Sequence, residues 1–402
     1  MNDIVSKLRN FIEQENFAGY DPYDGLNSAF LRFFTFGRKW PRLAVQQFMK
    51  RSRMNLRPVF GIGKARNPKG IGLSSRAYLE LYRQDPAKNE DCLIKTRELL
   101  KWLQDNSAKN FGYSGYCWGY NFDWQSAVFF IPKSHPTAVN TAFNGFAFLD
   151  AFEVTAEEEY LDVARSACDF ILKDLHKTGK GTTFCFSYSP FDHTCTHNAN
   201  LLAAELLIRV HWHTKEATLM SHAGRAVDFT LSHFNADGSI YQGTLPAQKF
   251  IDSFHTGFVL TSLQNIAQMS KLDENHPEYM RIMHNAYKYY KLTFFDPDGM
   301  PHYYYHKIYP VDLHCSSQGI ITFLKFQDYD HEALATARAI ADWTIENMWD
   351  SDKNYFYFQK TKHYMNKIAY LRWPNIWMLY ALALLQHAGW SRAPDIGNQL
   401  VI

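Results

Sequence analysis

A repeated helical signature constrains the fold of this chain more than any other feature of its sequence. Five times a long amphipathic segment ends in an acidic residue or a lysine next to an aromatic residue, and an aromatic-rich stretch follows. The interval of roughly 55 to 70 residues is one at which repeat architectures show themselves. Units that cannot bury their own apolar faces must stack on copies of themselves. The five pairs are Lys101-Trp102, Asp169-Phe170, Asp228-Phe229, Lys288-Tyr289 and Asp342-Trp343.

The repeat divides into helix pairs that alternate along most of the chain. Each unit is predicted to contain an inner helix, a short turn, an outer helix and a long loop. Alternating helices without a strand-helix-strand pattern favour an all-α fold, an (α/α)6 toroid of six helical hairpins, over a parallel-sheet fold. The predicted inner helices are 74–82, 139–153, 198–211, 252–269, 312–326 and 373–387, and the predicted outer helices are 90–104, 158–175, 215–234, 277–295 and 331–348.

The last predicted inner helix has no outer partner after it, so the N-terminal helices are expected to supply one. No Ser/Gly/Pro tract, charge block or low-complexity run suggests a linker. We therefore predict that residues 1–402 form a single toroid domain, with 1–69 as a helical segment that closes or caps the ring. Short alternating aromatic runs in the loops between units predict small β-hairpins over one mouth of the ring.

The composition limits which partners the protein is expected to bind and where in the cell it is expected to work. The formal net charge is +2 over 402 residues, which argues against bulk nucleic-acid binding, and no nucleic-acid partner is predicted. The six cysteines form no CxxC pair and are expected to be reduced thiols. The N-terminal stretch MNDIVSKLRNFIEQENF is amphipathic and lacks the apolar region of a signal peptide, so a cytoplasmic location is expected.

The hairpin pattern resembles the six-hairpin glycosidase superfamily over residues 70 to 390. That resemblance implies a toroid that acts on carbohydrate, since the superfamily includes glycoside hydrolases, polysaccharide lyases and sugar epimerases. The stretches DWQSAVFFIPKSHPTAVNTAFNGFAFLDAFEVT and YYYHKIYPVDLHCSSQGIITF also resemble proteins encoded among bacterial surface-polysaccharide genes. The Cys-His-Gly, aspartate-rich and His-Pro-Gly-His elements of individual toroid families are absent, so no family's catalytic residues carry over.

Polar groups recur where the predicted inner helices begin, and in a toroid these helix starts converge on one face. Asp and Asn at such places are also preferred helix N-caps, which is the structural alternative. Histidine is a poor cap, yet it occurs at three of these starts, which favours a functional cleft. The candidate catalytic residues are His197, His255, His314, Asp252, Asp312 and Tyr304.

Two chemistries fit this set of residues. Glycoside hydrolysis needs a pair of carboxylates. Proton abstraction beside a uronic-acid carboxylate needs a base such as His or Tyr, and Asn or Arg to stabilise the developing charge. The abundance of His, Tyr and Asn favours the second. We therefore predict a carbohydrate-active enzyme of bacterial polysaccharide metabolism, of epimerase or lyase type, that acts on an acidic glycan or a lipid-linked oligosaccharide. The alternatives are a glycoside hydrolase with an Asp pair and a non-catalytic glycan-binding protein.

Aromatic and polar residues on the loops supply candidate substrate contacts. Aromatic faces pack against the C–H faces of sugar rings, although loop aromatics also plug the joints between repeats. Arg372, with Lys133 or Asn140, is expected to hold a carboxylate. The candidate substrate-binding residues are Trp118, Asp123, Trp124, Lys133, Asn140, Asn198, Tyr241, Arg372 and Trp373.

Two further motifs have a chemical and a structural interpretation. The run from His193 to His197 alternates potential zinc ligands, but no HExxH or second cysteine pair accompanies it, so neither a metal nor a cofactor is predicted. Residues 38–57 contain seven Lys or Arg and no acid. This segment is predicted either to contact an anionic membrane or a lipid pyrophosphate peripherally, or to be a solvated outer helix.

Overall fold

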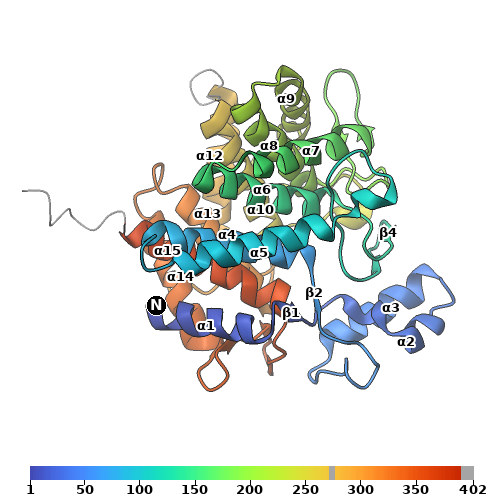
Figure 1. Ribbon diagram of the computed structural model, residues 1–402, viewed down its shortest axis with the longest axis vertical. Helices are drawn as coiled ribbons and strands as arrows, with labels where there is room; N and C mark the ends of the chain where they lie inside the picture. The colour runs from blue at the N-terminus through green and yellow to red at the C-terminus, as the bar shows by residue number, and fades with distance from the viewer. Residues whose placement is uncertain (271–276, 391–402) are drawn as a thin grey trace, which may run out of the picture.

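The computed structural model describes residues 1–270 and 277–390, and six inner helices form the centre of the molecule (Figure 1). Each inner helix contacts the next in chain order, and the last contacts the first, so the ring is closed. The predicted all-α (α/α)6 toroid is therefore confirmed. The inner helices are α4 (Pro68–Gln84), α6 (Ala138–Thr155), α8 (His197–Thr214), α10 (Ser253–Ser270), α13 (Leu313–Lys325) and α15 (Ile376–Trp390).

An outer helix packs on the inner helix of its own hairpin all round the ring. The sixth place is taken by α1 (Asn2–Gln14), which contacts α15. The single-domain boundary at 1–402 stays a prediction. The other outer helices are α5 (Glu90–Asp105), α7 (Glu158–Lys173), α9 (Ala217–Leu231), α12 (Pro277–Phe294) and α14 (Ala333–Met348).

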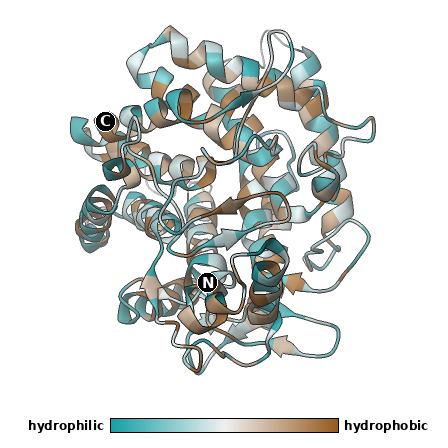
Figure 2. Cartoon of the chain, turned by 90° about the vertical axis from the view of Figure 1, so that its right-hand side faces the viewer, coloured by the Kyte–Doolittle hydropathy of each residue, from teal (hydrophilic) through white to brown (hydrophobic). Residues whose placement is uncertain are grey.

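Burial separates the two layers as the sequence pattern predicts. In α6 every residue from Ala138 to Ala151 is buried, so this helix is enclosed on all sides. In α7 the buried residues form one stripe that includes Tyr160, Val163 and Ala167, which is typical of a helix with one face in solvent. Peripheral helices in Figure 2 accordingly alternate between hydrophilic and hydrophobic colours.

One inner helix begins earlier than the sequence pattern predicts. The expected start was Ser74, but α4 begins at Pro68, where the Asn67 side chain accepts a hydrogen bond from the Lys69 amide at 3.1 Å. Gly72 allows a close approach of helices, because a Cβ there would lie 2.2 Å from the Asn144 side-chain oxygen. The earlier start places Lys69 on the first turn of the helix.

The remaining elements are short. Several aromatic loops form small β-hairpins with strands of two residues, as the sequence predicts. No helix in the described part of the chain is both long and apolar enough to cross a bilayer. The paired strands are β1 (Ala18–Gly19) with β2 (Ala65–Arg66), β3 (Trp124–Gln125) with β4 (Phe130–Ile131), β5 (Lys177–Thr178) with β6 (Cys185–Phe186), β8 (Trp349–Asp350) with β9 (Tyr355–Phe356), and β10 (Gln359–Lys360) with both β7 (Val311–Asp312) and β11 (Met365–Asn366). The other helical segments are η1 (Asp24–Asn27), α2 (Ala29–Phe33), α3 (Lys39–Arg51), η2 (Ala108–Phe111), η3 (Pro246–Gln248) and η4 (Leu371–Asn375).

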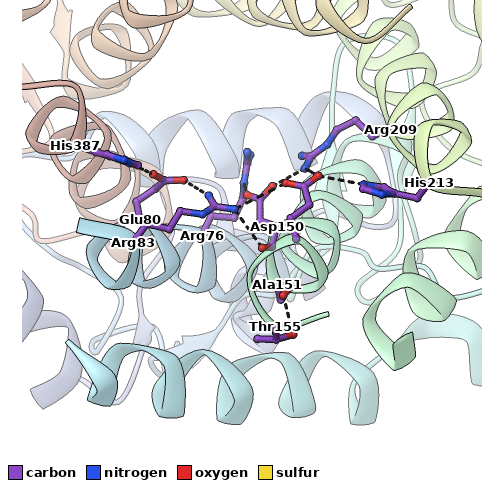
Figure 3. Close-up of polar contacts among 10 residues, drawn as sticks. Arg76, Glu80, Arg83, Asp150, Ala151, Thr155, Arg209, His213 and His387 are labelled. Carbon is purple, nitrogen blue, oxygen red and sulfur yellow. Dashed lines mark hydrogen bonds and ion pairs between the residues drawn. The ribbon is translucent and has the colours of Figure 1, made fainter. Parts of the chain in front are cut away.

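A buried charge network joins the inner helices near their C-terminal ends (Figure 3). Asp150 on α6 accepts from Arg76 on α4 and from Arg209 on α8, each at 2.6 Å. Burial raises the pKa of the Asp150 carboxyl, but the charges of Arg76, Arg209 and Arg83 outweigh burial and hold it below its ordinary value. Asp150 therefore joins three consecutive hairpins in its ionised form.

Replacing this carboxylate tests its structural role. We expect Asp150→Asn to lower the free energy of unfolding by about 3 to 5 kcal/mol, because the buried Arg76 loses its counter-charge and Arg209 keeps only the half-buried Glu153 at 3.1 Å. Urea unfolding followed by circular dichroism measures the change. Glu278→Gln is the control, since its ion pair with Arg281 is exposed and screened by water. Equal effects of the two substitutions would contradict the role assigned to Asp150.

Candidate active site

A cavity of about 330 Å³ lies where the inner helices begin, at the opposite ends of these helices from Asp150. Five inner-helix starts contribute to its lining, and the N-terminal segment and the loop around Trp124 cover it. A larger groove of about 710 Å³ lies on the outer wall between α9 and α12, away from the inner-helix starts. The five contributions from the helix starts are Lys69, Val139, Asn198, the group Asp252, Phe254, His255 and Phe258, and Arg372 with Trp373.

Asp252 and His255 form a hydrogen-bonded pair on the cavity wall. The Asp252 carboxylate accepts from the His255 backbone amide at 2.9 Å and lies 2.7 Å from its Nδ1. Because a carboxylate only accepts, Nδ1 carries the proton, and Nε2 is left as the basic nitrogen. The Gln242 side-chain amide lies 3.3 Å from Nε2 and donates to it. The pair therefore has the arrangement of a general base oriented by a carboxylate.

Arg372, by contrast, is already neutralised by the N-terminal segment. Its Nε donates to Asp21 Oδ2 at 2.5 Å, and a second guanidinium nitrogen donates to Asp21 Oδ1 at 2.9 Å. Both side chains are buried. Asp24 pairs with the buried Arg57 at 2.6 Å, which anchors the same turn of the N-terminal segment. Arg372 thus positions the cover of the cavity as well as lining it.

Lys69 is a basic side chain in the cavity without a counter-ion in contact with it. Its ammonium lies over the rings of Phe143 at 4.3 Å and Trp377 at 5.2 Å. Among the described residues no carboxylate lies within ion-pairing distance of it. The pKa of Lys69 is well below its ordinary value, mainly because the side chain is buried and secondly because of the charge of Arg372. An anionic ligand would restore the charged form, so this site favours an anion.

Aromatic rings form much of the remaining wall. The Tyr120 and Tyr188 hydroxyls lie 3.2 Å apart, and Trp124 packs edge-on against both rings. Tyr304 pairs with Asp252 through a backbone bridge and also lines the cavity. Burial, and after it the Asp252 charge, raises the pKa of Tyr304, which keeps its hydroxyl protonated. The wall combines flat rings with hydroxyl groups, as a sugar site requires.

The structure brings seven of the fifteen sequence-predicted site residues to the cavity and places eight outside its lining. His314 and Asp312 lie directly behind the wall. The His314 ring stacks on Trp373 at 4.3 Å, while the Trp373 indole donates to Asp312 at 3.2 Å. These two residues position Trp373. The seven in the lining are Asp252, His255, Tyr304, Asn198, Trp124, Arg372 and Trp373.

His314 is enclosed completely. Burial, and after it the charges of Lys69 and Arg372, lowers its pKa well below the ordinary value, so the ring is neutral. Phe254 stands between His314 and His255, with ring centroids 4.9 and 4.1 Å away.

The other six predicted residues lie further from the cavity. His197 points between α8 and α9, where its Nδ1 lies 3.3 Å from the Thr230 hydroxyl. Trp118 is fully buried and donates to the Leu103 carbonyl at 2.8 Å. The Lys133 backbone amide donates to Asp123 at 2.8 Å. Asn140 bonds Thr137 at the start of α6, and Tyr241 packs beneath the Lys249 ammonium.

Sequence reasoning did not single out Lys69, Gln242 or Tyr23, which also line the cavity. Lys69 had a usable signal, since Asn-Pro-Lys begins a helix with a cap and a first-turn proline. Gln242 and Tyr23 had none, because both lie on irregular loops whose position depends on the ring. No group of three or more His, Cys, Asp or Glu in the described ranges is arranged to hold a metal ion.

Solved structures share this fold. Neither a family model nor a curated protein sequence matches the chain. A cellobiose 2-epimerase from Bacillus thermoamylovorans superposes with a TM-score of 0.65 at 14% identity, over 97% of this chain and 100% of that one. A sugar epimerase from a ruminal bacterium gives 0.65 at 10% identity, over 82% and 90%. A GH76 α-mannanase from Bacteroides thetaiotaomicron gives 0.60 at 14% identity, over 82% and 87%.

These neighbours are toroid enzymes of the six-hairpin glycosidase type, so the resemblance seen in the sequence is confirmed for the fold. At such low identity the likeness establishes the architecture alone.

The burial of His197 leads to a prediction about its protonation state. Burial, and after it the neighbouring His233 and Lys249, lowers the pKa of His197 to about 3. We expect its ring to stay neutral from pH 5 to pH 8, unlike an ordinary histidine. Selective ¹³C labelling of histidine with NMR at varied pH measures this, with His197→Gln assigning the signal. Titration of that signal near pH 6.5 would place the ring in solvent.

Proposed function

We propose that this protein is a carbohydrate-active enzyme that moves a proton at a ring carbon of an acidic sugar, in an epimerase-type reaction. The observation that carries the proposal is the Asp252–His255 pair, which presents a basic nitrogen to a cavity lined with aromatic rings. The sugar epimerases among the structural neighbours support carbohydrate as the substrate class.

The proposed step begins with removal of the proton on the carbon next to the sugar carboxylate. His255 Nε2 takes the proton once the Gln242 amide releases that nitrogen, and the electron pair of the broken C–H bond moves into the carboxylate to give an enolate-like charge. Asp252 stabilises the resulting imidazolium through Nδ1. Tyr304, held protonated, returns a proton to the opposite face of the same carbon. The net result is inversion at that carbon, and exchange with water then removes the proton from the His255 imidazolium and returns one to the Tyr304 phenolate.

The anionic part of the substrate is assigned to Lys69. A carboxylate beside this ammonium would supply the counter-charge that the protein does not, and it would spread the developing negative charge onto a cation. Arg372 is less suited to this role, since Asp21 already occupies two of its nitrogens.

The alternative reactions differ in what they need from the cavity. A lyase would use the same base but expel a substituent from the neighbouring carbon. A glycoside hydrolase needs two facing carboxylates, whereas Asp252 is the single carboxylate among the described lining residues, since Asp312 lies behind Trp373. A non-catalytic glycan-binding protein needs the aromatic wall but not the histidine pair. The cavity therefore favours proton transfer.

The pathway and the location of the enzyme are inferred from the sequence resemblance to surface-polysaccharide proteins. We propose that the glycan is an intermediate of such a polysaccharide, that the enzyme works in the cytoplasm, and that residues 38–57 contact a membrane peripherally. The exposed basic residues of this segment, Arg38, Lys39, Arg51 and Arg53, support that contact.

Substituting the proposed base tests the reaction. We expect His255→Gln to lower the rate of solvent-deuterium incorporation into a uronic-acid oligosaccharide by about 100-fold or more, because general-base catalysis is lost. Mass spectrometry and NMR measure the incorporation. His197→Gln is the matched control and should retain activity, since its ring faces α9.

The products separate the alternatives. An unsaturated product that absorbs in the ultraviolet would replace the epimerase with a lyase, and release of reducing sugar would replace it with a hydrolase. Sugar binding that survives His255→Gln, with no turnover in the unaltered protein, would overturn enzymatic function.

The charge on Lys69 predicts a pH dependence of binding. Its lowered pKa means that the amine takes up a proton when an anion binds, so affinity for glucuronate should rise as pH falls. Calorimetry in buffers of different ionisation enthalpy should show proton uptake for glucuronate and none for glucose.

Lys69→Met should abolish both the proton uptake and the preference for glucuronate. Lys133→Met is the control and should keep both, because Lys133 lies outside the cavity lining. Equal affinities of the unaltered protein for glucuronate and glucose would rule out Lys69 as the anion site.

A further inference from the structure

The N-terminal region carries a marked excess of positive charge. Between Asp24 and Glu80 the chain contains twelve Lys or Arg and no Asp or Glu, although the whole protein has 42 basic and 40 acidic residues. Several of these basic side chains are exposed on and beside α2 and α3, among them Arg38, Lys39 and Arg51. The two helices stand out from the toroid at one side (Figure 1). This part of the surface is therefore strongly cationic.

The same segment exposes large aromatic rings. Residues 29–60, here called the docking segment, contain eight of the twenty exposed large apolar side chains of the described chain. Phe33, Phe36 and Trp40 are the most exposed rings, at 71%, 72% and 73%. The rings form one patch, because successive contacts of 5.0 to 6.4 Å join Phe48, Phe60, Phe30, Phe34, Phe33 and Phe36.

Contiguous exposed apolar surface marks an interaction site, and its composition identifies the partner. Rings that enter the headgroup region, with Lys and Arg beside them, are the features of interfacial membrane binding. Anionic lipids attract each basic residue near the surface. Protein interfaces, in contrast, are depleted of Lys at their centres, while Lys39 lies over the Trp40 ring at 5.2 Å within the docking segment. The charge complementarity favours an anionic bilayer.

The docking segment is also part of the wall of the cavity. Leu43, Gln46 and Gln47 of α3 line the cavity, and Lys50 of the same helix donates to the Tyr23 hydroxyl at 2.8 Å. The Arg42 guanidinium lies 3.9 Å from the centre of the Phe130 ring on β4, which ties α3 to the loop that covers the cavity. One helix thus joins the exposed aromatic patch to the candidate active site.

We propose that the docking segment binds an anionic lipid bilayer and that the cavity takes its acidic sugar from a lipid-linked glycan held in that bilayer. The substrate assignment rests on the proposed function, whereas the membrane contact stands on the surface alone. A glycan carried by a membrane lipid is presented at the bilayer surface, and α3 places the cavity beside the docking segment.

Vesicle co-sedimentation of the full chain tests the contact. We expect binding to phosphatidylcholine vesicles that contain phosphatidylglycerol, and little binding to phosphatidylcholine alone. Replacing three exposed basic residues, in R38Q/K39Q/R51Q, should weaken binding by about 100-fold, because each contributes roughly fivefold. The triple variant F33S/F36S/W40S should weaken binding to the same vesicles by at least tenfold, because three inserted rings are lost.

Matched variants elsewhere on the surface control for general effects. The substitutions I94S/F111S/L292S remove three exposed apolar side chains, and K88Q/K101Q/R281Q removes three exposed charges, all outside the docking segment. Both should leave vesicle binding unchanged. Equal binding to both kinds of vesicle, or none, would overturn the proposal. A dimer that F33S/F36S/W40S dissociates, without vesicle affinity, would show that the patch is a protein interface.

Turnover assays distinguish the membrane contact from the catalytic step. F33S/F36S/W40S should turn over a water-soluble acidic oligosaccharide as the unaltered protein does, and should lose at least tenfold in turnover of the same glycan on a lipid carrier in vesicles. His255→Gln should bind vesicles normally and turn over neither substrate. Loss of vesicle binding in His255→Gln, or equal turnover of both substrates by F33S/F36S/W40S, would contradict the proposed link between bilayer and cavity.

Discussion

The ionised carboxylate of Asp150, enclosed by guanidinium groups from the two adjacent inner helices, is the interaction on which the arrangement of the ring most depends. Inner helices that are apolar on every face would slide against one another at little cost, because dispersion contacts are not directional. A buried carboxylate has a narrow choice of positions, since it must meet Arg76 and Arg209 at hydrogen-bond distance. Such a group sets the register of α4, α6 and α8.

The register of these helices also determines the geometry of the candidate active site. With α4, α6 and α8 held in register by Asp150, their N-terminal ends contribute Lys69, Val139 and Asn198 to the cavity. Helix N-termini carry partial positive charge, and Lys69 lies on the first turn of one of them. Burial and the charge of Arg372 lower the pKa of Lys69, which is the reason for proposing an anionic ligand there. Asp252 and Asp21 balance part of this positive charge through His255 and Arg372.

Local patterns predicted the helices well and the site only in part. The ends of every hairpin helix except α4 fall within about three residues of those expected, since helical periodicity depends on near neighbours. His255 was found because it follows a capping aspartate at a helix start. His197 has a similar local sequence, yet its ring points to α9. Successive side chains on a helix point in directions about 100° apart. The sequence does not show which neighbouring helix lies in each of these directions.

The sequence by itself determined the repeat, the closed all-α ring and the end of the ring at which polar groups gather, because these follow from periodicity and capping along a continuous stretch of chain. Only the tertiary structure decided which side chains share the cavity. It brought Asp21 onto Arg372 from more than three hundred residues away, left Lys69 without a counter-ion in contact, and placed His314 behind Trp373. Such choices depend on distance in space between segments far apart in the chain, and no local pattern encodes that distance.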